Sequence, residues 1–338
     1  LFIVNSIEHF KDSMMNVPFK LKKIFPSAKT VSLKKLFHLH VNKIIPTRTN
    51  STGNEPSKKF SDAEKKDSVI MESIDRIALI GINRPERRNA IDKRTAKLLI
   101  ELFKDFEKNS TLDVAVLYGK GGNFCSGFDM KELAKSPDEM KTLIEECLRT
   151  KTRPLGPTLK QFEKPVIAAV NGYAVAGGLE LALMCDLRIV EETAILGMYN
   201  RRFGIYYSHT NIPMTDGGSV RLPKMIGLSR ALDLIITGRQ INGKIAFDWG
   251  LANRIVDTGT ALGQAMNLAR IIGTLPKTSL LYDRNSVYYS TFESCNFEDA
   301  MQFELRNANN AISSGTWQKG VKKFVVDGQG RHGSFKVN

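Results

Sequence analysis

Two glycine-containing segments are the part of this sequence whose residue types and spacing could do chemistry. Residues 123–130 read Asn-Phe-Cys-Ser-Gly-Phe-Asp-Met, and residues 171–178 read Asn-Gly-Tyr-Ala-Val-Ala-Gly-Gly. Each places glycine where a predicted strand ends and a helix begins. Such a junction leaves unpaired backbone N–H groups at the positive end of the helix dipole, and an anionic oxygen binds well there.

Two N–H groups that converge from separate loops would hold an enolate or a tetrahedral oxyanion. Loss of one such donor typically costs on the order of 3 kcal/mol of transition-state stabilisation. Glycine at a strand-to-helix turn is often required by the backbone geometry alone. Neither segment is therefore diagnostic by itself.

The elements that must position these segments follow from apolar runs and their periodicity. Strands are predicted at Ile77–Ile82, Val114–Tyr118, Val166–Val170 and Leu187–Val190. Helices are predicted after Asp92, a plausible N-cap, and at Leu179–Cys185, Ser229–Thr237 and Ala261–Ile272. Strands that alternate with helices predict an α/β fold.

The composition is that of a soluble globular protein, with 42% hydrophobic and 25% charged residues in a chain of 338. No apolar run approaches the roughly 18 residues that a membrane span needs. The four cysteines are too sparse for a disulfide scaffold, which favours a reducing compartment. No spacing of His and Cys suits a zinc site, so we expect no metal.

The chain divides by composition into a leader (1–55), a linker (56–72), a core (73–275) and a helical C-terminal region (276–338). Residues 1–55 hold nine Lys/Arg and three Asp/Glu, and residues 13–54 contain no acidic residue. A basic, hydroxyl-rich N-terminus is typical of an organelle transit peptide. We expect import into the mitochondrial matrix. A basic tail without a targeting role, on a cytoplasmic protein, is the alternative.

The order and spacing of several motifs resemble the crotonase superfamily of enoyl-CoA hydratases and isomerases. The residues that carry the resemblance are 83–90, 124–130, 164–172, 177–182, 217–223 and 234–239, which read NRPERRNA, FCSGFDM, KPVIAAVNG, GGLELA, GGSVRLP and LIITGR. The resemblance implies a spiral of ββα units with a C-terminal helical region. It also implies a homotrimer or homohexamer that binds an acyl-CoA substrate, with coenzyme A as part of the substrate and no separate cofactor.

The resemblance also implies where the thioester binds. It places the oxyanion hole at the N–H groups of Phe128 and Gly177. The segment Phe128, Asp129, Met130 and Lys131 is expected to lie along the bound CoA, with the adenine and pantetheine near Arg87, Arg88 and Ala90. An ordinary solvated basic face is the alternative for the Arg and Lys side chains.

The family's hydratases use two glutamates, and the first of them corresponds to Glu180. On the first turn of a helix, its carboxylate could reach the same site as the Gly177 N–H. The second is expected at position 200, where this chain has Asn200, an amide that cannot exchange protons as a general acid or base. Asp216 is the best substitute, although it could instead be the N-cap of the following helix.

One segment has no counterpart of similar length in the family. Residues 206–212 read Tyr-Tyr-Ser-His-Thr-Asn-Ile and lie between the motifs around Gly204 and Pro213. The segment could reshape the acyl pocket and bring His209 near the chemistry. A surface loop or an error in the gene model is the simpler interpretation.

Three function classes follow from these observations. An enoyl-CoA hydratase, which adds water reversibly to a 2-enoyl-CoA, is the first, with enoyl-CoA isomerase as its alternative. An RNA-binding homologue is the second, because the net charge is +14 and residues 1–55 contribute only +6 of it, which leaves +8 on the rest of the chain. Lys93, Arg94 and Lys97 are too few for a strong RNA-binding face, so we do not expect a nucleic-acid partner. A catalytically silent scaffold, suggested by Asn200, is the third.

Overall fold

The structure is a computed structural model that describes residues 67–134, 138–200 and 212–326. The chain divides into units 1–63 and 64–338, and every element below belongs to the second unit. The predicted leader and the segment 206–211 with His209 lie outside the described residues. Among the described residues, no helix has both the length and the apolar character needed to cross a membrane.

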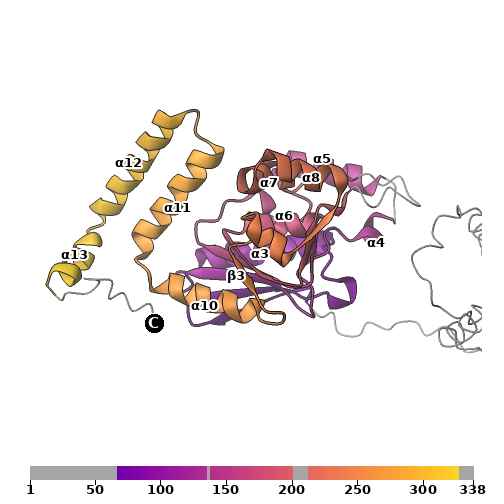
Figure 1. Ribbon diagram of the computed structural model, residues 1–338, viewed down its shortest axis with the longest axis horizontal. Coiled ribbons are helices and arrows are strands. Elements are labelled where there is room, and N and C mark those ends of the chain that lie inside the picture. The colour runs from indigo at the N-terminus through magenta and orange to yellow at the C-terminus, as the bar shows by residue number, and fades with distance from the viewer. Residues whose placement is uncertain (1–66, 135–137, 201–211, 327–338) are drawn as a thin grey trace, which may run out of the picture. The chain divides into compact units, whose positions relative to one another are not determined.

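A six-stranded sheet forms the centre of the fold (Figure 1). Its strands, in spatial order, are β1 (Val69–Ile74), β2 (Ile77–Ile82), β3 (Val114–Gly119), β4 (Val166–Val170), β6 (Leu187–Glu191) and β9 (Arg254–Val256). Within this sheet, as far as the structure describes it, β1 and β2 pair antiparallel and the other neighbouring strands pair parallel. The predicted strands match β2, β3, β4 and β6. The α/β fold class is confirmed.

The first strand corrects a predicted boundary. β1 begins at Val69, inside the predicted linker 56–72, and its Val69 pairs with Ile82 at the far end of β2. The core therefore starts before residue 73. The polar residues Glu72 and Ser73 interrupt its apolar run, so that the segment lacks the continuous apolar pattern of the inner strands.

Alternation along the strands divides the core into two faces. On β2, Ile77 and Leu79 pack in one cluster with α10 (Ala261–Thr274), whereas Ile80 and Ile82 pack in the larger cluster on the opposite face. Because successive side chains of a strand point to opposite faces, a strand buried on both faces is apolar throughout. This explains why the run Ile77–Ile82 carries no polar side chain.

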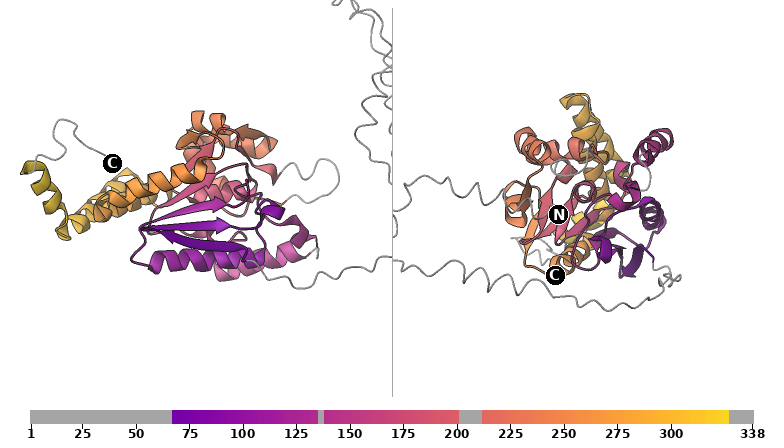
Figure 2. Two further views of the ribbon diagram at one scale, coloured as in Figure 1. Left: turned by 90° about the horizontal axis from the view of Figure 1, so that it is seen from below. Right: turned by 90° about the vertical axis from the view of Figure 1, so that its right-hand side faces the viewer.

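The remaining helices of the core lie on the side of the sheet opposite α10 or at its edge (Figures 1 and 2). They are α3 (Lys93–Lys108), α4 (Met130–Leu133), α5 (Glu139–Thr150), α6 (Gly177–Met184), α7 (Gly218–Ile226), α8 (Leu228–Thr237) and α9 (Gly243–Asp248), with the short 3₁₀ helices η2 (Pro85–Arg87) and η3 (Pro157–Leu159). The Asp92 side chain accepts a hydrogen bond from the Thr95 N–H, as expected for the N-cap of α3.

A second, three-stranded sheet stands beside the first. It contains β5 (Tyr173–Val175), β7 (Ile195–Gly197) and β8 (Gln240–Asn242) in the order β5-β7-β8. An isolated parallel bridge joins Cys125 to Ala174 of β5, and another joins Ile91 to Phe128. The bridge between Cys125 and Ala174 brings the two glycine-containing segments next to each other.

The C-terminal region is helical, as predicted. α11 (Lys277–Phe292) and α12 (Phe297–Ser313) pack side by side, and α13 (Trp317–Val325) follows (Figure 1). Asp186 anchors α11 to the core, because its Oδ1 accepts hydrogen bonds from Arg284 Nε at 2.7 Å and from the Tyr288 hydroxyl at 2.8 Å. Its Oδ2 accepts from the Val166 N–H of β4 at 2.7 Å.

Candidate active site

The two glycine-containing segments run side by side where β4 ends. The Phe124 N–H donates to Asn171 O at 2.8 Å, and the Cys125 N–H donates to Tyr173 O at 2.9 Å. The chain then brings Gly127, at φ 93°, against the start of α6. A Cβ added at Gly127 would lie 2.9 Å from the Gly177 nitrogen. The approach of the two backbones therefore requires glycine at position 127.

The backbone N–H groups of Phe128 and Gly177 donate no hydrogen bond to any of the residues that the structure describes. On either side of Phe128, Gly127 O accepts from the Ile91 N–H and the Asp129 N–H donates to Ile91 O, both at 2.8 Å. Gly177 is the first residue of α6, where no acceptor one turn earlier in the helix exists. Within the described ranges, neither N–H has a hydrogen-bond acceptor.

The backbone before Gly177 is held in an uncommon conformation. Ala176, the N-cap of α6, has φ 50° and ψ −128°, a combination that costs an L-residue of order 1–3 kcal/mol. Its N–H donates to Gly197 O of β7 at 2.8 Å, and its carbonyl accepts from the Leu179 N–H at 3.0 Å. These two bonds fix the direction of the turn that presents the Gly177 N–H.

Glu180 lies on the first turn of α6 and is only 2% exposed. Its Oε1 accepts hydrogen bonds from the N–H of Asp216 at 3.0 Å and of Gly218 at 2.8 Å. Its Oε2 has no partner in the part of the chain that the structure describes. One oxygen is therefore held by the backbone, and the other remains available for proton exchange.

Burial raises the pKa of Glu180 to about 7, and the nearby Asp216 carboxylate adds to the increase. The two backbone N–H groups on Oε1 favour the charged form and oppose this change only in part. A carboxyl group with a pKa near the working pH can both accept and return a proton.

Asp216 is also buried, but its oxygens are engaged. Oδ1 accepts from the Leu155 N–H at 3.0 Å and from the Thr158 hydroxyl at 2.5 Å, and Oδ2 accepts from the Thr215 hydroxyl at 2.7 Å. Burial raises the pKa of Asp216 despite these bonds. The alternative prediction that Asp216 caps the next helix is wrong, because Gly217 is the N-cap of α7 and no side chain caps it.

Asn200 follows β7 and is half-buried. Its Nδ2 donates to Ile212 O at 3.2 Å, whereas its Oδ1 is buried without a hydrogen-bond partner among the described residues. The carbonyl of Ile212 fixes which way the amide faces, because the opposite orientation would place two oxygens together. A polar acceptor is thus left unsatisfied in the fold.

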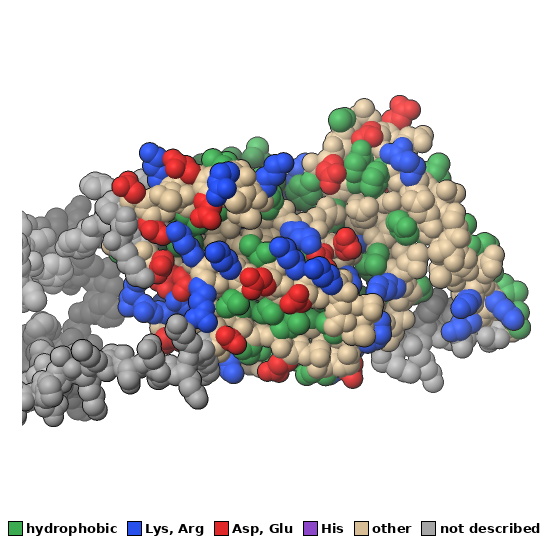
Figure 3. All heavy atoms as spheres, turned by 180° about the vertical axis from the view of Figure 1, so that it is seen from behind, with side chains coloured by type: hydrophobic (Ala, Val, Ile, Leu, Met, Phe, Trp, Pro, Cys, Tyr) green, Lys and Arg blue, Asp and Glu red, His purple; other side chains and the backbone are tan. Residues whose placement is uncertain are grey.

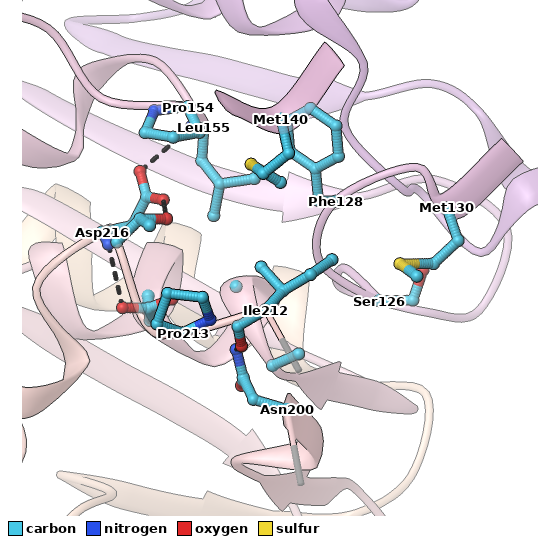
Figure 4. Close-up of a pocket in the computed structure, with 14 residues that line it drawn as sticks. Ser126, Phe128, Met130, Met140, Pro154, Leu155, Asn200, Ile212, Pro213 and Asp216 are labelled. Carbon is cyan, nitrogen blue, oxygen red and sulfur yellow. Dashed lines mark hydrogen bonds between the residues drawn. The ribbon is translucent and has the colours of Figure 1, made fainter. Parts of the chain in front are cut away.

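These groups share one cavity, which has a volume of ≈ 60 Å³ (Figure 4). In this view Asn200 lies beside Ile212, and Asp216 lies on the Leu155 side. The cavity is lined by Ser126, Phe128, Met130, Met140, Pro154, Leu155, Ala176, Gly177, Glu180, Asn200, Ile212, Pro213, Thr215 and Asp216. The structure therefore brings together all four residues that were predicted as catalytic, together with Asn200.

The residues that were predicted to bind CoA differ from one another in burial and in their contacts. Arg87 is half-buried, and its Nη1 is buried without a hydrogen-bond partner within the described ranges. Arg88 is exposed and its guanidinium lies 5.2 Å from the centroid of the Tyr173 ring. Ala90 is buried, and its carbonyl accepts from Arg84. Of these three residues, the two arginines present side-chain donors.

In the neighbouring segment, Met130 lines the cavity and Lys131 is exposed. Asp129 has other partners, because its Oδ2 lies 2.8 Å from Arg84 Nη2 and its Oδ1 accepts from the Lys131 N–H at 3.1 Å. Asp129 is thus the N-cap of α4 and half of an ion pair. These contacts indicate a structural role for its side chain.

Sequence reasoning missed several contributors to the site. Leu155 and Thr158 bind Asp216 from η3 and the turn before it, a segment that carries no motif. Gly218 was quoted only as part of a motif, yet a Cβ there would lie 3.0 Å from Glu180 Oε1. The one available signal was the pair Gly217-Gly218 directly after an acidic residue.

Comparison with known proteins identifies the family to which this chain belongs. The family model described as Enoyl-CoA hydratase/isomerase matches residues 72–333. YngF of Bacillus subtilis, which carries the family's name, is 38% identical over 197 residues, which cover 58% of this chain and 72% of YngF. A Dictyostelium discoideum protein named "Probable enoyl-CoA hydratase, mitochondrial" is 28% identical over 284 residues, 82% of this chain and 94% of that protein.

Among solved structures, the enoyl-CoA hydratase EchA1 from Mycobacterium marinum is similar, with a TM-score of 0.68 and 28% identity. The alignment covers 78% of this chain and 97% of that structure. The resemblance seen in the sequence is thereby confirmed, together with the crotonase-like fold. The chain is an acyl-CoA-processing enzyme that belongs to the enoyl-CoA hydratase/isomerase family.

Proposed function

We propose that this enzyme adds water reversibly to the double bond of a 2-enoyl-CoA through a thioester enolate. The proposal rests on one observation. Phe128 and Gly177, whose backbone N–H groups have no acceptor among the described residues, line the same cavity as Glu180. A site of this kind can stabilise an oxyanion and move a proton beside it. Those are the two requirements of enolate chemistry at a thioester.

In the first step, the thioester oxygen lies between the N–H groups of Phe128 and Gly177. Water oxygen forms a bond to the β-carbon, and the π electrons of the double bond move toward the thioester, whose oxygen becomes an enolate. The two N–H groups bind this oxygen more strongly as its negative charge develops, which lowers the barrier.

Glu180 moves the proton in both steps. Its Oε2 accepts a proton from the attacking water while Oε1 stays bound to the Asp216 and Gly218 N–H groups. The same carboxyl then returns the proton to the α-carbon as the enolate collapses and the thioester carbonyl reforms. One water molecule is added overall, and Glu180 ends as it began.

Asp216 acts in this scheme through Glu180. Three protein donors already occupy its carboxylate oxygens, so that it is poorly placed to exchange a proton with substrate. Its negative charge raises the pKa of Glu180. We assign Asp216 as a positioning residue rather than as the second acid.

The second candidate function is isomerisation between 3-enoyl-CoA and 2-enoyl-CoA. Asn200 favours this function, because an amide at that position cannot exchange a proton. Glu180 then remains as the carboxyl group that lines the cavity and has an oxygen without a partner among the described residues. A thioester dienolate, bound by the same two N–H groups, would form when Glu180 removes a proton from the α-carbon, and Glu180 would return that proton to the γ-carbon.

The deciding experiment incubates the purified enzyme with short, medium and branched 2-enoyl-CoA and 3-enoyl-CoA thioesters. Hydration is followed by mass spectrometry as the gain of one water, and isomerisation by chromatography without a change in mass. The proposal predicts hydration of at least one 2-enoyl-CoA. Isomerisation without hydration would favour the second function, and absence of both would contradict enolate chemistry at this site.

CoA would enter along Arg87, Arg88 and Lys131, whose positive charges suit its phosphates. Binding of nucleic acid is less well supported. On the face shown in Figure 3, basic and acidic side chains are interspersed. Lys93 of α3 pairs with Glu139, and Arg94 lies 3.9 Å from Asp67, which neutralises part of the only candidate basic face identified in the sequence.

We also propose a homo-oligomer in the mitochondrial matrix. The basic composition of residues 1–55 and the name of the Dictyostelium relative support this location. Fusion of residues 1–66 to a fluorescent reporter is expected to direct the reporter to mitochondria. A diffuse cytoplasmic signal would support the alternative location.

A further inference from the structure

The direction of the Phe128 N–H is set by a single β-bridge to Ile91. The Ile91 N–H donates to Gly127 O and the Asp129 N–H donates to Ile91 O, both at 2.8 Å. Because the residues on either side of Phe128 make both bonds, the Phe128 N–H itself is turned away from Ile91. The bridge is isolated rather than part of a longer ladder, so that side-chain contacts can contribute strongly to its geometry.

Arg84 connects the two sides of this bridge. Its Nη2 lies 2.9 Å from Asp92 Oδ2, next to Ile91 in the chain, and 2.8 Å from Asp129 Oδ2, next to Phe128. Its Nη1 donates to the carbonyl of Ala90. A guanidinium presents its donors in a fixed planar arrangement. One side chain therefore holds residues 90, 92 and 129 in one relative position.

The Arg84 side chain is itself held firmly. It is 14% exposed and that of Asp129 is 8% exposed, and hydrogen bonds between charged groups are short and strong. The Arg84 N–H donates to Asn89 Oδ1 at 2.9 Å, and the Arg84 carbonyl accepts from the N–H groups of Arg87 and Asn89. The guanidinium thus extends from a backbone turn that is fixed at both its N–H and its carbonyl.

The charge of Arg84 also bears on the bound thioester. Asp129 follows Phe128 directly in the chain, and its carboxylate would repel an enolate oxygen that binds to the Phe128 N–H. The guanidinium 2.8 Å from Asp129 Oδ2 opposes that repulsion. Arg84 is not among the residues that line the cavity, so that any effect on the substrate passes through Phe128 and Asp129.

We propose that Arg84 is the positioning residue of the oxyanion hole, because it fixes the segment that presents the Phe128 N–H and neutralises the Asp129 carboxylate beside it. The inference rests on the proposed function, in which this N–H binds the thioester oxygen. Arg84 touches no reacting atom. Its loss should weaken the hydrogen bond to the thioester carbonyl while the contacts to the rest of CoA remain.

The test uses Arg84→Met, which keeps an unbranched side chain without its charge or donors. Butyryl-CoA that carries a carbon isotope label at the thioester carbonyl is bound to the enzyme, and the carbonyl stretch is measured by difference infrared spectroscopy. A carbonyl that accepts stronger hydrogen bonds stretches at lower frequency. The unaltered enzyme should lower the frequency relative to free butyryl-CoA, and Arg84→Met should lose at least half of that shift.

Hydration of crotonyl-CoA is measured in parallel. For Arg84→Met we expect kcat to fall by about 10- to 100-fold, as for a misplaced reacting group, while KM changes by less than about threefold. The double variant Arg84→Met/Asp129→Asn removes the uncompensated carboxylate and keeps the oxygen that accepts from the Lys131 N–H. Its kcat and its carbonyl frequency should lie between those of Arg84→Met and the unaltered enzyme.

Arg284→Met is the matched control. Arg284 is 13% exposed and its Nε lies 2.7 Å from the similarly buried Asp186, on α11 and away from the cavity. Thermal unfolding should show that both single variants lose stability, since each leaves a largely buried carboxylate without its partner. Only Arg84→Met should change the carbonyl frequency. If Arg84→Met does not fold, the double variant, which leaves no unpaired carboxylate at position 129, is compared instead.

Two results would overturn the role of Arg84. The carbonyl shift could be retained in full by the folded Arg84 variants, or Arg284→Met could lose it to the same extent. Absence of the shift in the unaltered enzyme would be a different failure, because it would contradict the oxyanion hole itself. The infrared measurement needs no turnover, so that a shift which depends on Arg84 would support this role even if the enzyme did not hydrate crotonyl-CoA.

Discussion

Glu180 is buried, which disfavours its charged form, and yet one of its two carboxylate oxygens has no hydrogen-bond partner among the described residues. Its position on the first turn of α6 is inherent in the sequence, because it follows Gly177 by three residues. Its environment is not, since the donors to Oε1 belong to residues 216 and 218 and the surrounding charge belongs to Asp216. The sequence could indicate the residue but not the pKa that fits it for proton transfer.

Glu180→Gln is expected to lower kcat by on the order of 10²- to 10⁴-fold, the usual contribution of a general acid–base group. Binding of the CoA ester should persist, because the amide oxygen can still accept from the Asp216 and Gly218 N–H groups. In the unaltered enzyme, kcat/KM should rise with pH through an apparent pKa of about 7, because Glu180 must be ionised to accept the proton.

Glu180→Gln is expected to increase the stability of the fold at high pH, although it lowers the activity. The folded state holds the Glu180 proton more tightly than the unfolded chain, so that this group's favourable contribution is present below pH 4.5 and is lost as pH rises through about 7. At pH 8, Glu180→Gln should therefore unfold at higher urea concentration, by a free energy on the order of 3 kcal/mol. Exposed Glu192→Gln is the control, and equal stability of the two variants would contradict the burial argument.

Asp216→Asn tests whether that carboxylate acts on Glu180 or on substrate. Removal of the charge should lower the pKa of Glu180, so that the acid limb of the kcat/KM profile moves to lower pH while the plateau is largely retained. Exposed Asp248→Asn should leave the profile in place. A loss of activity of about 10²-fold at every pH would instead make Asp216 a catalytic acid.

At the level of elements, the parts predictable from sequence are those with a long or strongly periodic pattern. The apolar runs of β2 and β4 gave their observed limits, and α3 was recognised by its apolar stripe and by Asp92 as N-cap. The three-residue strands β5, β7 and β8 are too short for alternation to be visible. They nevertheless position the site, because β5 pairs with Cys125 and β7 leads to Asn200.

The attachment of α11 depends on one carboxylate. Asp186 binds Arg284, Tyr288 and the N–H of Val166, and its loss would leave Arg284, which is largely buried beside it, with an uncompensated charge. Asp186→Ala is expected to destabilise the fold by about 3–5 kcal/mol and to increase hydrogen–deuterium exchange across residues 277–313. Asp248→Ala is the control. Unchanged exchange in α11 and α12 would show that other contacts hold these helices.

At the level of the whole molecule, α12 has two apolar faces. One packs against α11, where the rings of Tyr289 and Phe303 stack with centroids 3.8 Å apart. The other exposes Phe297, Met301 and Leu305, which recur every fourth residue and are 81%, 47% and 65% exposed. A contiguous exposed apolar stripe of this kind is typical of a surface that another chain covers, which supports the proposed homo-oligomer.

The unaltered enzyme is therefore expected to have a solution mass that is a multiple of 37.8 kDa by light scattering. Leu305→Glu should shift the mass toward that of the monomer, because a carboxylate in an apolar interface loses its hydration. Gln264→Glu on the exposed surface of α10 adds the same charge elsewhere and should not change the mass. An unaltered enzyme that is monomeric at micromolar concentration would contradict the proposal.

The central claim is that the approach of the two glycine-containing segments creates the binding site for the thioester oxygen. Gly127→Ala tests it with a close control, Gly122→Ala, because both residues have a positive φ, of 93° and 91° respectively. A Cβ at position 127 would lie 2.9 Å from the Gly177 nitrogen, whereas no atom outside the immediate chain neighbours lies within 4 Å of a Cβ at position 122.

The measurement is kcat/KM for hydration of crotonyl-CoA by the two variants, with stability determined in parallel. We expect both to lose roughly 1–2 kcal/mol of stability from the positive φ, and only Gly127→Ala to lose on the order of 10²-fold or more in kcat/KM. Equal activity of two folded variants would contradict the account, because the site would then not depend on the spacing between Phe128 and Gly177.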